Sequence, residues 1–312
     1  MTLEYAPGHR RNLTYLAMMA SYNVGGLLAA GLAIPLIPAF GWRVMFFLAL
    51  VPFLIVVPLG LKYMPESISF LLAEGRREEA ETLSRRYGIP LQEIARTVEK
   101  EEETAVHEGK LHALKTLVSR LYLVRTLAFW VAAFMGLMLI YGLSIWLPEV
   151  MRVAGYSVGS ALSFLVLFNV GAIVGSLAAG WLADRLGAKL VCGLFFSTAA
   201  VGIALLSLGM PLLLTYVFAG LAGAGTFGGM TLVYANVGQH YPASSRATAL
   251  GWAAGVGRVG AITGPILGGI LVGAGLAVPW GFYVFALAGV IAATILFLMP
   301  RSLAHAEEAE WM

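Results

Sequence analysis

Cysteine and charged residues are both scarce in this chain of 312 residues, and each scarcity excludes a class of protein. Cys192 is the only cysteine, which excludes disulfide frameworks and cysteine-rich metal sites. Charged residues make up 12% of the chain, whereas soluble domains carry roughly 25%. The net charge of +3 is too small to indicate a nucleic-acid partner. The composition therefore points away from a soluble domain and towards lipid as the solvent.

Patterns that mark enzymes are also missing from the sequence. We find no zinc-protease HExxH pattern, no nucleophile elbow, no phosphate-binding loop and no pair of carboxylates within an apolar run. The five histidines share no helix face with another metal ligand. We therefore expect neither an enzyme, nor a metal site, nor a cofactor.

Long uncharged runs are what the sequence has instead. Crossing the hydrocarbon core takes about 20 mostly apolar residues in a helix. Eight segments meet this condition and predict an all-α integral membrane fold with eight transmembrane helices. The predicted spans are 12–38, 43–62, 125–148, 158–183, 188–208, 211–237, 247–275 and 280–299.

The spacing of these spans predicts four regions. Residues 1–62 hold two transmembrane helices. Residues 63–123 are rich in charges of both signs and form a linker loop, in which 76–87 and 90–106 have the pattern of amphipathic helices. Residues 124–300 hold six further spans, and 301–312 form a tail.

The basic residues between spans predict an orientation. If both termini share a side with the long loop, only Arg43 and Arg152 fall on the opposite side. The side that carries more basic residues is then predicted to be cytoplasmic. We expect a multi-pass protein of the inner (plasma) membrane with both termini in the cytoplasm. The basic residues in the short segments of the predicted cytoplasmic side are Arg10, Arg11, Arg185, Lys189, Arg246 and Arg301.

Glycines four residues apart recur within the predicted spans. Small residues at this spacing let helices approach closely in lipid, so we expect packing surfaces. The alternative is that they are hinge positions of moving helices. The glycines concerned are Gly171, Gly175, Gly251, Gly255, Gly260, Gly264 and Gly268.

Arg258 is the one charge placed near the middle of the membrane. It lies twelve residues past Arg246, about 18 Å along a helix. A charge at this depth is costly, so it is a functional hypothesis by default. Because the planar guanidinium matches two carboxylate oxygens, we favour a role in binding an organic carboxylate. The competing interpretation is a structural pair with carbonyls or an acid elsewhere.

Other polar residues within spans are weaker candidates for substrate contact. Their alternative role is hydrogen bonding from helix to helix. They are Tyr22, Asn23, Tyr141, Asn169, Tyr234 and Asn236. At a predicted helix end, Asp184 can cap or pair across a short loop, which would suit a gate between helices.

Several motifs resemble one family. The run GWLADRLGAKL at 180–190, with Gly180, Asp184, Arg185 and Gly187, resembles the signature loop of the major facilitator superfamily. The run YPASSRATALGWAAGVGRVGAITGPILGG at 241–269 is similar to helix eleven and its approach in the aromatic acid:proton symporter family of that superfamily. The opening EYAPGHRRN, with Glu4 and Arg11, fits the same family around helix five.

The resemblance implies proton-coupled uptake of an aromatic or related carboxylate, with Arg258 matching the family's helix-eleven arginine. Small organic acids, protons and the lipid bilayer are the implied partners. The eight spans match helices five to twelve, that is, the last two helices of the N-terminal half and the complete C-terminal half. The first four helices, including the family's acidic first-helix motif, are unmatched. We expect a truncated chain that is inactive alone, whether mis-started, disrupted, or completed by a separate chain.

Two other functions stay open. A sugar or other metabolite porter of the same superfamily is less favoured, because no glutamine occurs in the run AFMGLMLIYGLSIWLPE. A non-transporting membrane fragment or scaffold would insert and fold without binding a substrate.

Overall fold

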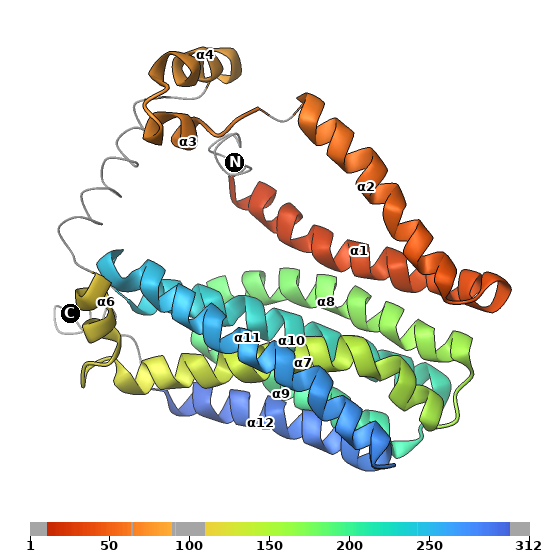
Figure 1. The fold of residues 1–312 in the computed structure, drawn as a ribbon. Helices are drawn as coiled ribbons and strands as arrows, with labels where there is room; N and C mark the ends of the chain where they lie inside the picture. Colours follow the sequence, from red (N-terminus) through yellow and green to blue (C-terminus); the bar gives the residue numbers. More distant parts are fainter. Residues whose placement is uncertain (1–10, 64, 89–90, 92–109, 242, 300–312) are drawn as a thin grey trace. The chain divides into compact units, whose positions relative to one another are not determined.

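The chain folds into long helices. A computed structural model describes residues 11–63, 65–88, 91, 110–241 and 243–299, and all regular structure in these ranges is helical. Within these ranges, eight helices are long and apolar enough to cross a membrane, which agrees with the predicted number of spans (Figure 1). They are α1 Arg11–Phe40, α2 Arg43–Tyr63, α7 Leu123–Val153, α8 Val158–Leu186, α9 Ala188–Leu205, α10 Leu212–His240, α11 Ala243–Gly273 and α12 Phe282–Leu298, with the short helices η2 Leu206–Leu208 after α9 and η3 Ala277–Gly281 before α12.

Local signals set the ends of α8. The Ser157 side chain accepts a hydrogen bond from the Ser160 backbone N–H at 3.3 Å, and so satisfies one of the free donors of the first turn. Gly187 ends the helix at a φ of 87°, in the left-handed region that favours glycine, and α9 begins at the next residue. A one-residue connection makes α8 and α9 consecutive, closely spaced spans.

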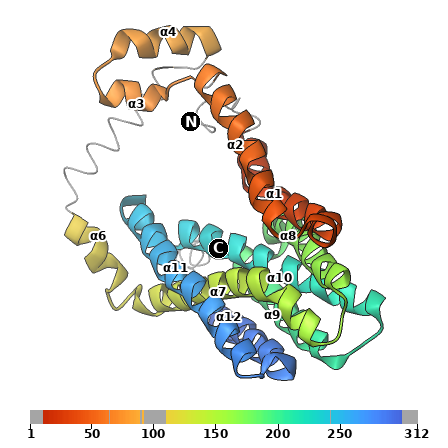
Figure 2. The ribbon, with the colours of Figure 1, turned by 45° about the vertical axis from the view of Figure 1, so that its right-hand side comes forward.

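Helices α7 to α12 form a bundle around one apolar core (Figures 1 and 2). The most extensive helix pairs are α7 with α11, α10 with α8 and α9, and α12 with α9 and α7. Since lipid is as apolar as the side chains, van der Waals packing rather than the hydrophobic effect holds such helices together. The largest fully buried side chains of this bundle include Phe129, Phe164, Phe168, Phe196 and Phe282.

Most of the predicted packing glycines do lie at helix contacts. A Cβ at Gly171 would overlap the Gly220 backbone, and one at Gly260 would overlap the Phe134 carbonyl oxygen. The neighbouring backbone therefore leaves no room for a larger residue there. Gly175, Gly264 and Gly268 are equally close to their neighbours. Gly251 and Gly255 differ, because nothing among the described residues lies within 4 Å of a Cβ built on either.

The linker contains a small charged unit. Its helix α4, Arg77–Tyr87, confirms the helix predicted over 76–87, while the one predicted over 90–106 lies outside the described residues except for position 91. The Arg76 guanidinium contacts the Glu79 carboxylate at 2.7 Å and the Glu66 carboxylate at 3.3 Å. The hydrogen bond from Arg76 lowers the pKa of the Glu79 carboxyl below its usual value. Helices α3, Ile68–Ala73, and α6, Lys110–Leu117, had not been predicted.

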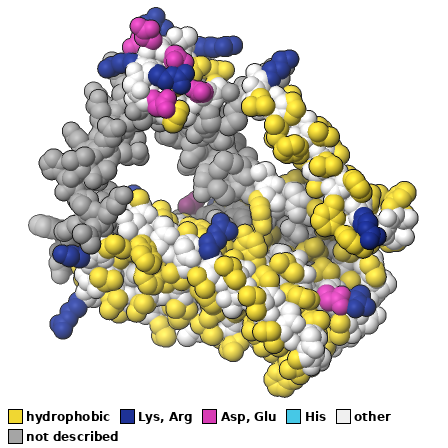
Figure 3. Space-filling model, in the orientation of Figure 1, with side chains coloured by type: hydrophobic (Ala, Val, Ile, Leu, Met, Phe, Trp, Pro, Cys, Tyr) yellow, Lys and Arg dark blue, Asp and Glu magenta, His cyan; other side chains and the backbone are white. Residues whose placement is uncertain are grey.

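Charge and apolar surface are separated along the chain. Acidic and basic side chains gather over α3 and α4, whereas the visible surface of α7 to α12 is largely apolar (Figure 3). Contacts divide the chain into one unit of Met1–Tyr22 and Leu36–His112 and a second of Asn23–Pro35 and Ala113–Met312. The six-helix bundle belongs entirely to the second unit, where the candidate site also lies.

Candidate functional site

Arg258 and Tyr141 form the centre of the candidate site. The two residues come from the most extensively packed helix pair, α11 and α7, and the Arg258 Nη1 donates a hydrogen bond to the Tyr141 hydroxyl at 3.2 Å. Arg258 is exposed and Tyr141 is half-buried in the described chain. One neutral hydroxyl leaves most of the five guanidinium donors available, so the pair can accept an anion.

Tyr234 of α10 belongs to the same group. It lies close enough to Arg258 and Tyr141 for both to act electrostatically on its hydroxyl. The three side chains come from three different helices, and the sequence separates them by up to 117 positions. The structure thus gathers a cation and two phenol hydroxyls, which is a donor set suited to a carboxylate.

The three asparagines that were predicted to contact the substrate, Asn23, Asn169 and Asn236, do not hydrogen-bond Arg258 in the described residues. The side-chain amides of Asn169 and Asn236 each donate to a carbonyl four residues earlier in their own helix, at 2.8 Å. Asn23 is buried in the part of α1 that clusters with the second unit. Their part in substrate binding stays a prediction.

The signature run lies at the junction of α8 and α9. The Arg185 guanidinium sits 3.9 Å from the centroid of the Trp181 ring, a cation–π contact. Gly187 adopts the positive φ of the turn, and Asp184 and Gly180 lie on the last turns of α8. Arg11 begins α1, and Glu4 lies outside the described residues. A gating role for these residues stays a prediction.

Glu149 does not serve as the counter-ion of Arg258. Its carboxylate is bound by Arg152 on the same helix, through hydrogen bonds of 2.9 and 2.7 Å. Asp184, the other acid near a span, is exposed at the end of α8. In the described spans, Arg258 therefore faces a hydroxyl rather than a carboxylate partner. The described residues also contain no cluster of three or more His, Cys, Asp or Glu side chains that could hold a metal ion.

Sequence reasoning missed an aromatic pair beside this site. Trp252 of α11 stacks on Trp130 of α7, with ring centroids 5.5 Å apart and planes inclined by 23°. Helical spacing of apolar residues on α11 was a usable signal, because Trp252, Val256 and Val259 are three or four residues apart and share a face. That spacing alone does not tell a face turned towards lipid from one turned towards a site.

Comparison with protein families gives a direct match. The Major Facilitator Superfamily profile matches residues 1–231 and 164–311 of the chain. Two solved structures of the xylose transporter XylE share the fold. One, the proton:xylose symporter bound to 6-bromo-6-deoxy-D-glucose, has a TM-score of 0.64 at 20% identity and covers 100% of this chain and 69% of that one. The other, from E. coli in a partially occluded inward-open conformation, has a TM-score of 0.66 at 18% identity, covering 97% and 66%.

Curated relatives have closer sequences. The chain is 32% identical to the benzoate transport protein of Acinetobacter baylyi over 95% of its own length and 63% of that protein. It is 32% identical to the gentisate transporter of Corynebacterium glutamicum over 96% and 62%, and 33% identical to the gallate transporter of Pseudomonas putida over 93% and 64%. The chain thus spans less than two thirds of these relatives. The predicted resemblance to aromatic acid transporters and the predicted all-α membrane fold are confirmed.

Proposed function

This chain belongs to the Major Facilitator Superfamily, and from that premise we propose that it forms the substrate-binding half of a secondary transporter for aromatic or other small organic acids. The observation that carries the proposal is the group of Arg258, Tyr141 and Tyr234, contributed by α11, α7 and α10. The named substrates of the curated relatives, benzoate, gentisate and gallate, support the acid class.

In this proposal Arg258 binds the carboxylate. Its fork of N–H donors matches two carboxylate oxygens, and the Tyr141 hydroxyl holds the guanidinium in place when no anion is bound. A substrate carboxylate would replace a neutral acceptor by a charged one, and charge-assisted hydrogen bonds are roughly twice as strong. Exchange of the hydroxyl for the carboxylate is therefore favourable.

Coupling to protons requires a titratable group near Arg258, and the described residues place no carboxylate there. Glu149 is paired with Arg152, and Asp184 lies exposed at a helix end. The proposal assigns the proton-binding carboxylate to helices equivalent to the remaining third of the relatives, on the same polypeptide or on a separate chain. It also places the protein in the inner membrane with both termini in the cytoplasm, because basic residues concentrate on that side.

Equilibrium binding tests the proposal. Purified chain in detergent is titrated with radiolabelled benzoate, alongside Arg258→Ala, Arg258→Lys and Arg246→Ala. Loss of one charge-assisted pair should weaken binding by about 10- to 100-fold in Arg258→Ala. Arg258→Lys should recover part of that loss, since it keeps the charge without the fork.

Arg246→Ala is the matched control, because it removes an exposed cation from the same helix. Its benzoate affinity should equal that of the unmodified chain. Equal affinity in Arg258→Ala would remove Arg258 from carboxylate recognition and leave the structural interpretation of this residue.

A further inference from the structure

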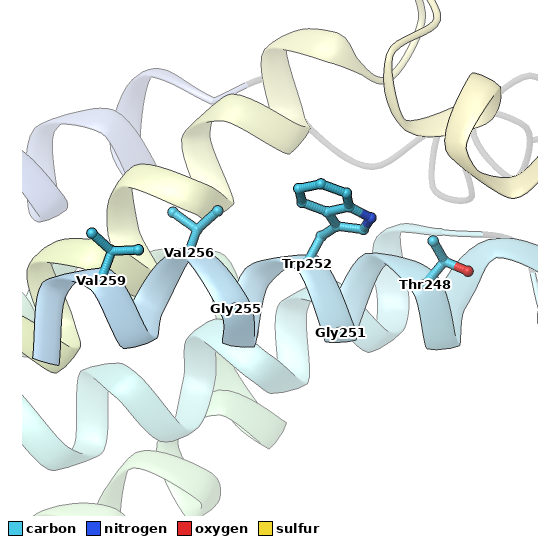
Figure 4. A pocket seen from close by; sticks show the side chains of 6 residues that line it. All are labelled: Thr248, Gly251, Trp252, Gly255, Val256 and Val259. Carbon is cyan, nitrogen blue, oxygen red and sulfur yellow. The ribbon is translucent and has the colours of Figure 1, made fainter. Parts of the chain in front are cut away.

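A hollow of about 570 Å³ lies along the first half of α11 (Figure 4). Its size falls within the range of roughly 300–1,000 Å³ that small-molecule sites occupy. The side chains of Trp252, Val256 and Val259 point to the same side of the helix. The described lining residues all belong to α11, and Thr248 supplies the one side-chain hydroxyl among them; they are Thr248, Gly251, Trp252, Gly255, Val256 and Val259.

The two glycines of the lining make this space. A Cβ on Gly251 or Gly255 would meet nothing within 4 Å among the described residues. Farther along the same helix, the position that a Cβ on Gly260 would take is occupied by the α7 backbone. Five residues separate Gly255 from Gly260, so the hollow lies on a different side of α11 from the side that α7 covers at Gly260.

Trp252 offers an aromatic wall to this space. One part of its ring is held by the stack on Trp130, yet 45% of the residue stays exposed. The stack fixes the orientation of the indole, so a second ring would meet a pre-ordered partner. Aromatic pairs of this kind contribute beyond the area that they bury.

The hollow lies beside Arg258 on the surface of α11. Gly255 and Arg258 are three residues apart, which makes them neighbours on the helix surface. Trp252 lies six residues before Arg258, about 9 Å along the axis. Gly255 and Trp252 are also three residues apart, so a carboxylate on Arg258 can place its ring over Gly255 and against the edge of Trp252.

We infer that this hollow is the subsite for the ring of an aromatic carboxylate, with Trp252 as the residue that selects the ring. The inference rests on the proposed function and deepens it. A sugar would leave several hydroxyls without partners, since the described lining residues offer one side-chain hydroxyl, and each unpaired polar group is costly. A flat apolar ring loses no hydrogen bonds there.

Competition binding tests the inference on the full chain in detergent. Benzoate and acetate are compared as ligands, since acetate has the carboxylate without the ring. Trp252→Leu removes the aromatic wall, and Gly255→Val fills the hollow. Both should weaken benzoate binding by about 10-fold while acetate binding is unchanged in Trp252→Leu. Trp280→Leu, an exposed tryptophan outside the hollow, is the control and should bind both ligands as the unmodified chain does.

Three results would overturn the inference. Arg258-dependent binding of benzoate and acetate with equal affinity, unaffected by Trp252→Leu, would retain the proposed function and remove the ring subsite. Absence of any Arg258-dependent binding would overturn both the proposed function and the ring subsite. A change in particle mass by light scattering in Trp252→Leu, with unchanged benzoate affinity, would assign the hollow to a second copy of this chain.

Discussion

The two halves of α11 carry the same glycine spacing and use it differently. In the second half, Gly260 and Gly264 lie against the backbone of α7, and a side chain at either would collide with a carbonyl. In the first half, nothing among the described residues lies within 4 Å of a Cβ built on Gly251 or Gly255. Arg258 lies at the transition between them. A four-residue glycine repeat thus predicts a narrow strip on the helix surface, whereas the position of the neighbouring helix decides whether that strip is covered.

The largest loss of stability should come from a larger side chain in the second half of α11, which is packed against α7. Gly260→Val forces branched carbons into the Phe134 carbonyl, and the rigid backbone of α7 cannot move away cheaply. We expect a loss of stability of about 3 kcal/mol or more, the upper end for overpacked sites. Thermal unfolding in detergent and the yield of monodisperse protein measure it.

Gly251→Val is the matched control, because it makes the same change on the same helix where nothing is in the way. Its stability should stay within about 1 kcal/mol of the unmodified chain. If both variants were equally damaged, the contrast between the two halves would be wrong.

A smaller loss of stability should follow from removing a hydrogen bond between α7 and the second half of α11. The Trp146 indole N–H of α7 donates to the Pro265 carbonyl oxygen of α11 at 2.7 Å, while its ring covers Gly268. Trp146→Phe keeps most of the ring and removes the hydrogen bond, which should cost about 1 kcal/mol. Trp280→Phe, outside this contact, should unfold at the original temperature. An unchanged melting temperature in Trp146→Phe would mean that this bond contributes nothing to the α7–α11 contact.

The smallest effect should have the opposite sign. Gly251→Ala adds one methyl group in open space and restricts the unfolded chain, so it should stabilise the helix by up to about 1 kcal/mol. The melting temperature should rise slightly. A fall instead would show that this half of α11 is also closely covered.

The spans were predictable from sequence, but the site only in part. Eight apolar runs of sufficient length could be counted directly, because lipid requires long helices whose backbone polar groups bond within the helix. Arg258 stood out since a charge is rare at that depth. Its partner Tyr141 could be named as a polar candidate but not paired with it, as the two are 117 residues apart. The short helix α3 was missed because six residues carry little periodic signal.

The sequence by itself determined that this chain crosses a membrane, which segments do so, and which charge lies deep within a span. Those properties depend on each segment's own length and polarity against the lipid. Only the tertiary structure decided which glycines are covered, that Tyr141 hydrogen-bonds Arg258 with Tyr234 nearby, and that Trp252 stacks on Trp130. These depend on the rotation of one helix against the next, and that rotation is set by side chains distant in the sequence.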